Sequence, residues 1–164
     1  MIYQCVVPQF TKMLENLLAI LDEAKKFDVG VLLQSRRAPD QFALMRQIQV
    51  ACDTAKLGAA RLTDTENSAP AHDDSEATLA EIKARIASVV TYLGGLAPEA
   101  FAAAAERRIS QPRWKDKTLS GEEFLIQHVM PNFYFHATMV HSILRHNGVG
   151  IGKSSYLGAM PFRD

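Results

Sequence analysis

The sequence predicts an all-α protein, a four-helix bundle of up-and-down helices that spans residues 1–164 as a single domain. Three observations predict this class. Four segments repeat apolar residues every three or four positions, the period of a helix that buries one face. No segment alternates apolar and polar residues over the length of a convincing strand. The chain of 164 residues has the size of one ordinary domain with a sizeable core.

The first helix is expected from Phe10 to Phe27 and the second from Phe42 to Leu62. Helical spacing joins the apolar residues Phe10, Met13, Leu17, Ile20, Ala24 and Phe27 in the first segment. In the second it joins Phe42, Met45, Ile48, Cys52, Ala55, Ala59 and Leu62. Both stripes are wide enough to pack against more than one neighbouring helix.

The third helix is expected from Leu79 to Leu96, where Leu79, Ile82, Ile86, Val89, Leu93 and Leu96 repeat the pattern. Before it, residues 63–74 form a polar, acidic loop, and Asp73 with Glu76 offers a capping box for the helix start. At the far end, the pair Gly94–Gly95 weakens the helix.

The fourth helix is expected to contain Leu125, Val129, Phe133, His136, Val140 and Ile143 on one side. Ser120 and Glu123 have the spacing of a capping box at its start. Pro131 falls inside the pattern, so we expect a kink or short break near Met130–Asn132.

The stretch NGVGIGKSS, Asn147 to Ser155, carries part of a phosphate-binding loop, whose pattern is G-x-x-x-x-G-K-[ST]. Asn147 stands where the first glycine is needed, and a helix rather than a strand precedes the stretch. Asn147 and Gly148 suit the end of a helix, where positive φ costs little. We therefore expect no nucleotide loop here, but a short C-terminal tail that turns away from the bundle.

Composition and charge narrow the classes of partner. Lysine plus arginine equals aspartate plus glutamate, 18 against 18, whereas a nucleic-acid binder usually shows a basic excess. The N-terminal residues lack the pattern of a signal peptide, and no segment has the ~18 uninterrupted apolar residues of a membrane helix. Cys5 and Cys52 form no C-x-x-C pair and suit two thiols in a reducing compartment. We expect a cytoplasmic protein that binds neither nucleic acid nor membrane.

Three segments carry a resemblance to a known family: LMRQIQVACDTAKLGAARL, EIKARIASVVTYL and PNFYFHATMVHSILRHNGVGIGKSSYLG. They resemble an uncharacterised bacterial family, domain of unknown function nineteen-ninety-three, within the DinB-like superfamily. The resemblance covers nearly the whole chain. It implies a DinB-like four-helix bundle, paired as a homodimer, with a site between the helices.

The resemblance also implies a divalent metal such as zinc, nickel or iron, because superfamily members are described as metalloenzymes and some are thiol transferases. Their metal is held by three histidines, one on the second helix and an H-x-x-x-H pair on the last. His136 matches the first member of that pair, but Val140 stands at the second position. The second helix has no histidine, so one of the three ligands carries over, His136.

Five residues are the candidate ligand-binding site. His136 lies in the middle of the fourth stripe and should point into the bundle, with Asn132 one turn earlier on the same side. Gln49, Asp53 and Lys56 lie on one flank of the second stripe. If that flank faces His136, an imidazole, a carboxylate and an ammonium meet, and together they could bind an anion or move a proton. The alternatives are a buried histidine with an ordinary partner and a simple Asp53–Lys56 ion pair.

The remaining candidates have plainer expectations. His72 lies in the polar loop and should be solvated, and His128 lies near the helix start, off the central stripe. His141 faces away from His136, towards solvent or a dimer partner. The basic stretch Arg107–Lys117 is expected to be a solvated connection, with Trp114 packed on the bundle.

These observations leave three hypotheses open. The protein is a non-catalytic binding module that holds a small molecule near His136, or a diverged metal-dependent enzyme of transferase or hydrolase type. The third hypothesis is a purely structural homodimer. Neither a catalytic residue nor a substrate can be read from the sequence.

Overall fold

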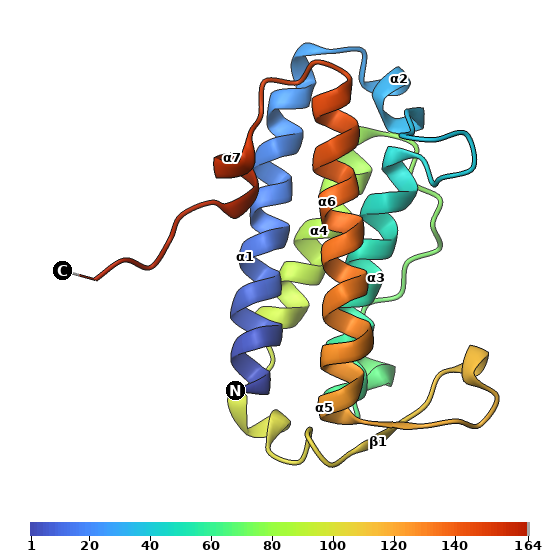
Figure 1. Cartoon of the computed structure of the whole chain (residues 1–164), viewed down its shortest axis with the longest axis vertical. Coiled ribbons are helices and arrows are strands. Elements are labelled where there is room, and N and C mark those ends of the chain that lie inside the picture. Colours follow the sequence, from blue (N-terminus) through green and yellow to red (C-terminus); the bar gives the residue numbers. More distant parts are fainter. Residues whose placement is uncertain (164) are drawn as a thin grey trace.

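The computed structural model describes residues 1–163 and is mostly helical (Figure 1). Its long helices are α1 (Ile2–Glu23), α3 (Leu44–Thr63), α4 (Leu79–Gly94) and α6 (Met130–His146). Shorter helices are α2 (Val29–Gln34), α5 (Gly121–Phe124) and α7 (Lys153–Leu157). Single 3-10 turns are η1 (Ala24–Lys26), η2 (Glu66–Ser68), η3 (Pro98–Phe101) and η4 (Pro112–Trp114). The all-α prediction is confirmed, although the chain forms more helices than the four expected.

The β structure within residues 1–163 is a short antiparallel ladder between β1 (Arg108–Ile109) and β2 (Leu119–Ser120). Strands of two residues leave no alternating pattern to detect, which is why the sequence did not predict them.

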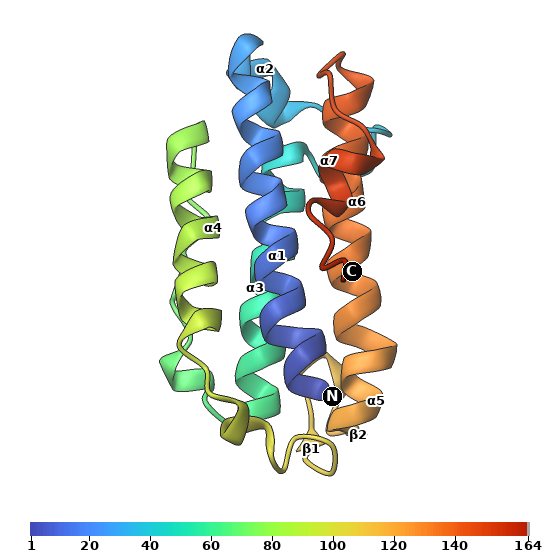
Figure 2. The same ribbon diagram turned by 90° about the vertical axis from the view of Figure 1, so that its left-hand side faces the viewer.

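The four long helices surround one apolar core (Figure 2). Around the core, α1 packs against α4, α4 against α3, and α3 against α6, which returns to α1. The largest fully buried side chains come from all four: Phe10, Leu14 and Leu17 on α1, Ile48 and Leu62 on α3, Ile82 and Ile86 on α4, and Phe133 on α6. None of the described helices is both long and apolar enough to cross a membrane.

The order of helix directions differs from the predicted alternation, because α3 and α4 run in the same direction. The hydroxyls of Thr65, just after α3, and Tyr92, near the end of α4, lie 3.4 Å apart. At the opposite end, Lys83 near the start of α4 contacts Asp22 at the end of α1, at 2.6 Å. The connection from Asp64 to Thr78 therefore returns along the bundle. About fifteen extended residues span ~50 Å, more than the ~30 Å length of a 20-residue helix.

Two predicted helix boundaries are wrong. Phe27 lies beyond η1 and is exposed, and Phe42 precedes α3 with 51% of its surface exposed. Both residues continue the helical spacing of their stripes, but periodicity does not show where the backbone leaves the helix. Pro8, conversely, lies inside α1, which begins at Ile2.

Side-chain caps fix the starts of α4 and α5. The predicted box at Ser120 and Glu123 is confirmed: Ser120 Oγ accepts from the Glu123 amide at 3.2 Å, and Glu123 accepts from the Ser120 amide at 2.9 Å. The box predicted at Asp73 and Glu76 is wrong. Thr78 and Glu81 form the capping box of α4 instead.

Pro131 does not break the last helix. The irregularity lies just before it, in a π turn (Leu125–Val129) that joins α5 to α6 in one continuous helix. Proline has no amide hydrogen and its ring crowds the carbonyl of residue i−4, which here is Gln127 within the π turn. The predicted break near Met130–Asn132 is therefore replaced by a widened turn one step earlier.

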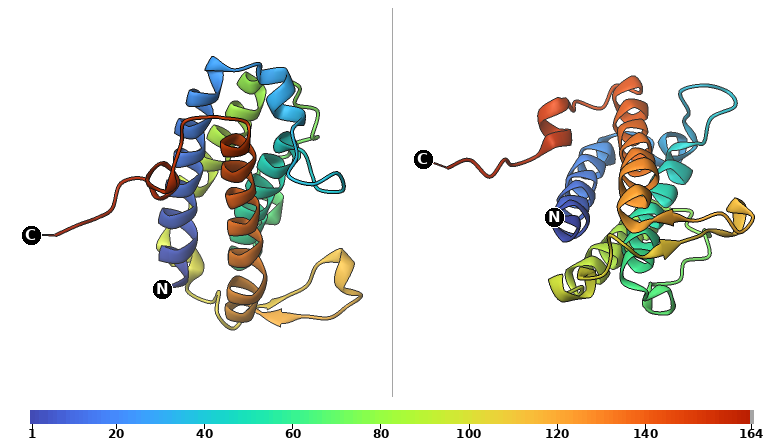
Figure 3. Two further views of the ribbon diagram at one scale, coloured as in Figure 1. Left: turned by 45° about the horizontal axis from the view of Figure 1, so that its top comes forward. Right: turned by 60° about the horizontal axis from the view of Figure 1, so that its bottom comes forward.

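The chain after α6 folds back rather than turning away from the bundle as predicted. Helix α7 packs against α1, where Asn16 Nδ2 donates to the Tyr156 carbonyl at 3.0 Å. The Tyr156 hydroxyl lies 3.1 Å from Thr138 Oγ1, and His141 Nε2 lies 3.1 Å from the Gly152 carbonyl. His141 is thus covered by the chain's own tail. Residues 159–163 then extend away from the helices (Figure 3).

Candidate functional site

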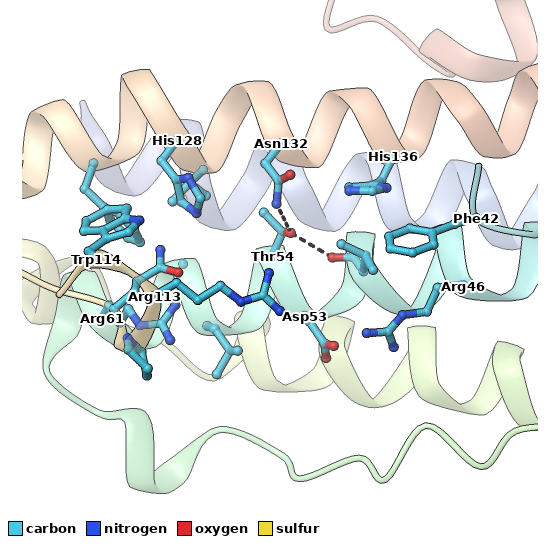
Figure 4. A pocket seen from close by; sticks show the side chains of 17 residues that line it. Phe42, Arg46, Asp53, Thr54, Arg61, Arg113, Trp114, His128, Asn132 and His136 are labelled. Atoms are coloured by element: carbon cyan, nitrogen blue, oxygen red, sulfur yellow. Dashed lines mark hydrogen bonds between the residues drawn. The ribbon is translucent and has the colours of Figure 1, made fainter. Parts of the chain in front are cut away.

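A cleft of about 500 Å³ lies between α3, α6 and the segment that follows β1. Seventeen residues line it: Phe42, Arg46, Val50, Asp53, Thr54, Leu57, Gly58, Arg61, Gln111, Pro112, Arg113, Trp114, Phe124, His128, Val129, Asn132 and His136. Figure 4 shows α6 and α3 as its two long walls, with Trp114 and Arg113 entering at one end. The β1–β2 hairpin that carries them projects from the side of the bundle (Figure 3).

The wall formed by the π turn and α6 presents three polar side chains at four-residue intervals: His128, Asn132 and His136. Asn132 Nδ2 donates to Thr54 Oγ1 at 2.8 Å across the cleft, and that hydroxyl donates to the Val50 carbonyl at 2.7 Å (Figure 4). The Thr54 hydroxyl therefore both accepts and donates a hydrogen bond. This bridge ties α6 to α3 at the middle of the cleft.

His136 points into the bundle, as predicted, and only 7% of it is exposed. Its Nδ1 lies 2.6 Å from Gln47 Oε1. The imidazole stacks on Phe42, with ring centroids 6.4 Å apart, and meets the edge of Phe135 at 5.2 Å. Burial, and then the charge of Arg46, lowers the pKa of His136, so the ring is neutral at pH 7 and Nδ1–H donates to Gln47.

The predicted Asp53–Lys56 ion pair is confirmed, with Lys56 Nζ 3.0 Å from Asp53 Oδ1. Lys56 itself is buried and contacts the long connection, 2.9 Å from the Pro70 carbonyl and 2.7 Å from His72 Nδ1. The prediction that His72 is simply solvated is therefore wrong. Burial first, and then Lys56, lowers the pKa of His72, so a neutral ring accepts from the ammonium.

A second polar cluster, centred on Arg85, lies on the other side of α3. Arg85 Nη2 donates to Asp53 at 2.7 Å, and Nη1 donates to Asp74 at 2.6 Å and to Glu76 at 3.0 Å. Gln49 joins this cluster, because its Nε2 donates to Glu76 at 2.9 Å. Burial alone would lower the pKa of Arg85, but the three carboxylates outweigh it and raise the pKa. We call these five residues the Arg85 cluster.

The five predicted site residues therefore separate into two groups. His136 and Asn132 line the cleft, whereas Gln49 and Lys56 face the long connection on the other side of α3. Asp53 belongs to both, because it lines the cleft and bonds Lys56 and Arg85. The imidazole–carboxylate–ammonium group is not formed, because Gln47, rather than Lys56, meets His136. Gln47 and Gln49 are two residues apart on α3, so their side chains point about 200° apart at 100° per residue. Gln47 therefore meets His136, while Gln49 meets Glu76 on the other side of the helix.

The end of the cleft opposite His136 is aromatic. Trp114 packs on the bundle, as predicted, with its ring 6.0 Å from Phe124 and 5.4 Å from His128, both edge-on. His128 in turn stacks on Phe124 at 5.6 Å. Burial, then the charge of Arg61, lowers the pKa of His128. His128 lies off the buried stripe, as predicted: it is half-buried, whereas Leu125 and Val129 are buried.

The side chains of the cleft do not fit the three-histidine metal site that the resemblance implies. Of the three histidines in that site, this chain has a counterpart for one, His136. The carboxylate of Asp53, another residue of the cleft, is already bonded to Arg85 and Lys56. Nowhere in residues 1–163 do three histidine, cysteine, aspartate or glutamate side chains gather closely enough to hold a metal ion. A catalytic zinc site needs three such ligands.

We therefore expect protein purified without a histidine tag to contain far less than one zinc, nickel or iron per chain. The measurement is elemental analysis of the wild type and of His136→Ala, with the metal content of the buffer as the blank. Near-stoichiometric metal in the wild type that disappears in His136→Ala would contradict this expectation.

Comparison with known proteins identifies a family and similar solved structures. The family model described as domain of unknown function (DUF1993) matches residues 2–157. A crystal structure of a DinB family member protein from Shewanella denitrificans shares 58% sequence identity with this chain. It superposes with a TM-score of 0.96, and the match covers 100% of this chain and 96% of that one. No curated protein matches the chain.

Proposed function

This chain belongs to the DUF1993 family, and on that premise we propose that it is a DinB-like bundle that binds a small molecule in the cleft beside His136. The observation that carries the proposal is the cleft itself. Its volume of about 500 Å³ lies in the ~300–1,000 Å³ range of small-molecule sites. It combines aromatic walls with a few polar groups that converge from separate elements, the composition that such sites share.

Binding is better supported than catalysis. The described lining residues include no cysteine, serine or lysine, and the Thr54 hydroxyl is occupied by Asn132 and Val50. Cys52, on the same helix as the α3 wall, is fully buried, and burial raises the pKa of its thiol to about 12. An activated nucleophile needs a neighbouring base or a lowered pKa. A metal-dependent transferase or hydrolase is less well supported, because residues 1–163 hold no cluster of three metal-ligating side chains.

A structural homodimer is the second candidate, and exposed aromatic side chains favour it. Phe42 is 51% exposed and Phe135 is 54% exposed, and the two flank His136 at one mouth of the cleft. A second copy that covers these rings would remove apolar surface from water. This candidate differs from the first in leaving the cleft without a ligand.

The proposal is tested by filling the cleft with a larger side chain and measuring whether small-molecule binding is lost. Val50 lines the cleft, whereas Val31 on α2 is 62% exposed and lies outside it. With a library of small polar and aromatic fragments, ligand-observed NMR should detect binding to the wild type and to Val31→Trp. We expect the same fragments not to bind Val50→Trp, because the indole occupies their space.

Two outcomes would overturn the proposal. One is a wild-type protein that binds no fragment. The other is a folded Val50→Trp variant, checked by its circular dichroism, that binds the same fragments as the wild type.

A further inference from the structure

Hydrogen-bond donors without acceptors gather at the Trp114 end of the cleft. Arg61 comes from the last turn of α3, His128 from the π turn, and Gln111 and Arg113 from the hairpin segment. All four line the same cleft (Figure 4 labels three of them). The Gln111 amide nitrogen is buried and has no hydrogen-bond partner anywhere in residues 1–163. A buried donor in this state loses its bond to water and gains nothing in return.

The two arginines at this end make no ion pair in the described chain, although the charge of Glu66 acts on Arg61 from a distance. Within residues 1–163, neither Arg61 nor Arg113 lies within 4.0 Å of a carboxylate. Neighbouring arginines do have partners: Arg107 pairs with Asp64 at 2.8 Å, and Arg108 donates to Thr118 at 3.0 Å. Arg46, at the other end of the cleft, pairs with Asp74, so the two cleft-lining arginines without a carboxylate partner are those at the Trp114 end.

Burial makes this lack of ion pairs more costly. Arg61 is half-buried, and the loss of water lowers the pKa of its guanidinium. The carboxylate in the lining, Asp53, is already bonded to Arg85 and Lys56, so it cannot neutralise Arg61 or Arg113. A partly desolvated cation gains most from an anion that brings its own acceptors.

Beside these donors lies an apolar surface. Leu57, Gly58 and Val129 come from the facing helices, and Trp114 and Phe124 add aromatic rings. A flat apolar group can pack on this surface while an attached anion meets the donors.

We infer that the Trp114 end of the cleft is an anion subsite, which selects a small organic acid with a carboxylate or phosphate group. Arg61, Arg113 and Gln111 donate to that group, and the apolar body of the ligand lies against Trp114 and extends towards Asn132 and His136. This inference rests on the proposed binding function and names its ligand class.

The test compares three probes with the same ring: phenyl phosphate, benzoate and the neutral benzyl alcohol. Titration calorimetry at low salt should show at least one anion binding about tenfold or more tightly than the alcohol. Whichever anion binds more tightly identifies phosphate or carboxylate as the preferred group. Affinity for that anion should fall about 10- to 100-fold in Arg61→Gln and in Arg113→Gln, because each loses a charge-assisted hydrogen bond.

Lys115→Gln is the matched control, because it removes one positive charge from the same hairpin at a residue that does not line the cleft. Its affinity should stay within about twofold of the wild type. Equal binding of benzyl alcohol and the anions would overturn the inference, as would equal losses in Arg113→Gln and Lys115→Gln. Absence of binding by all three probes would overturn it too. Fragments that bind the wild type but not Val50→Trp would leave the binding function intact in each case.

Discussion

Replacing Arg85 by methionine is expected to lower the free energy of unfolding by about 3 kcal/mol, the lower end of the range for breaking a buried ion pair. The Arg85 side chain is only 1% exposed and donates to Asp53, Asp74 and Glu76. Without it, three carboxylates that fix the long connection against α3 and α4 lose their common partner. Asp53 and Asp74 keep 28% and 36% exposure, which is why the lower end applies. Urea unfolding at pH 7 measures the change.

Arg46→Met is the control for this prediction, because Arg46 bonds the same Asp74 from a side chain that is 41% exposed. Its loss should cost about 1 kcal/mol or less, as for a surface pair. A loss in Arg85→Met no larger than in Arg46→Met would contradict the prediction.

The pH dependence of the free energy of unfolding gives a second test of the role of Arg85. Burial raises the pKa of both Asp74 and Glu76, but hydrogen bonds, with Arg85 prominent among the donors, outweigh it and leave both pKa values below normal. Groups with lowered pKa values stabilise the fold above their unfolded pKa values of about 4 and lose this effect as the pH falls. The loss of stability between pH 7 and pH 3 should therefore be smaller in Arg85→Met than in the wild type.

Gly121→Ala is expected to cost about 3 kcal/mol, the upper part of the usual range for an overpacked site. A methyl group at Gly121 would lie 1.7 Å from the Ala104 carbonyl oxygen. That oxygen belongs to the backbone, so no side-chain rotation can relieve the clash. The start of α5 would have to move away from the 102–105 segment, whose Ala105 carbonyl accepts from the Glu122 amide at 3.1 Å.

Thermal and urea unfolding of Gly121→Ala beside Gly94→Ala separates the clash from the general effect of adding a methyl group. Gly94 ends α4, and a methyl group there meets no atom within 4 Å. Gly94→Ala should leave the stability unchanged or raise it by up to about 1 kcal/mol. A Gly121→Ala variant as stable as the wild type would show that α5 does not press against Ala104.

Helical periodicity predicted the core of the fold well, because a stripe reports which residues share a face. The residues Ile82, Ile86, Val89 and Leu93 are all fully buried, as are Phe133, Val140 and Ile143. Periodicity could not predict that α3 and α4 run in the same direction. That choice depends on the long connection, which is held by the Arg85 cluster and by Lys56, and it has no repeating pattern.

For the site, the inward position of His136 and the Asp53–Lys56 pair could be predicted, since each depends on one helix alone. The partner of His136 could not, because it depends on how α3 is rotated against α6. Arg85 was missed although a signal was present. It follows Ile82 by three residues and precedes Val89 by four, so a charged residue stands on the buried stripe of the third helix. Such a position predicts buried carboxylate partners.

The π turn at Leu125–Val129 also has a consequence for changes in chain length. It holds one residue more per turn than the α-helix on either side. A chain that lost one residue here could close the turn into regular α-helix without leaving a gap. Everything before the turn would then keep its orientation relative to α6, because the extra residue is contained within one winding of the helix. Phe124 would stay at the cleft with Asn132 and His136, whereas the loss of one residue from regular helix within α6 would rotate the flanking segments by about 100° relative to each other.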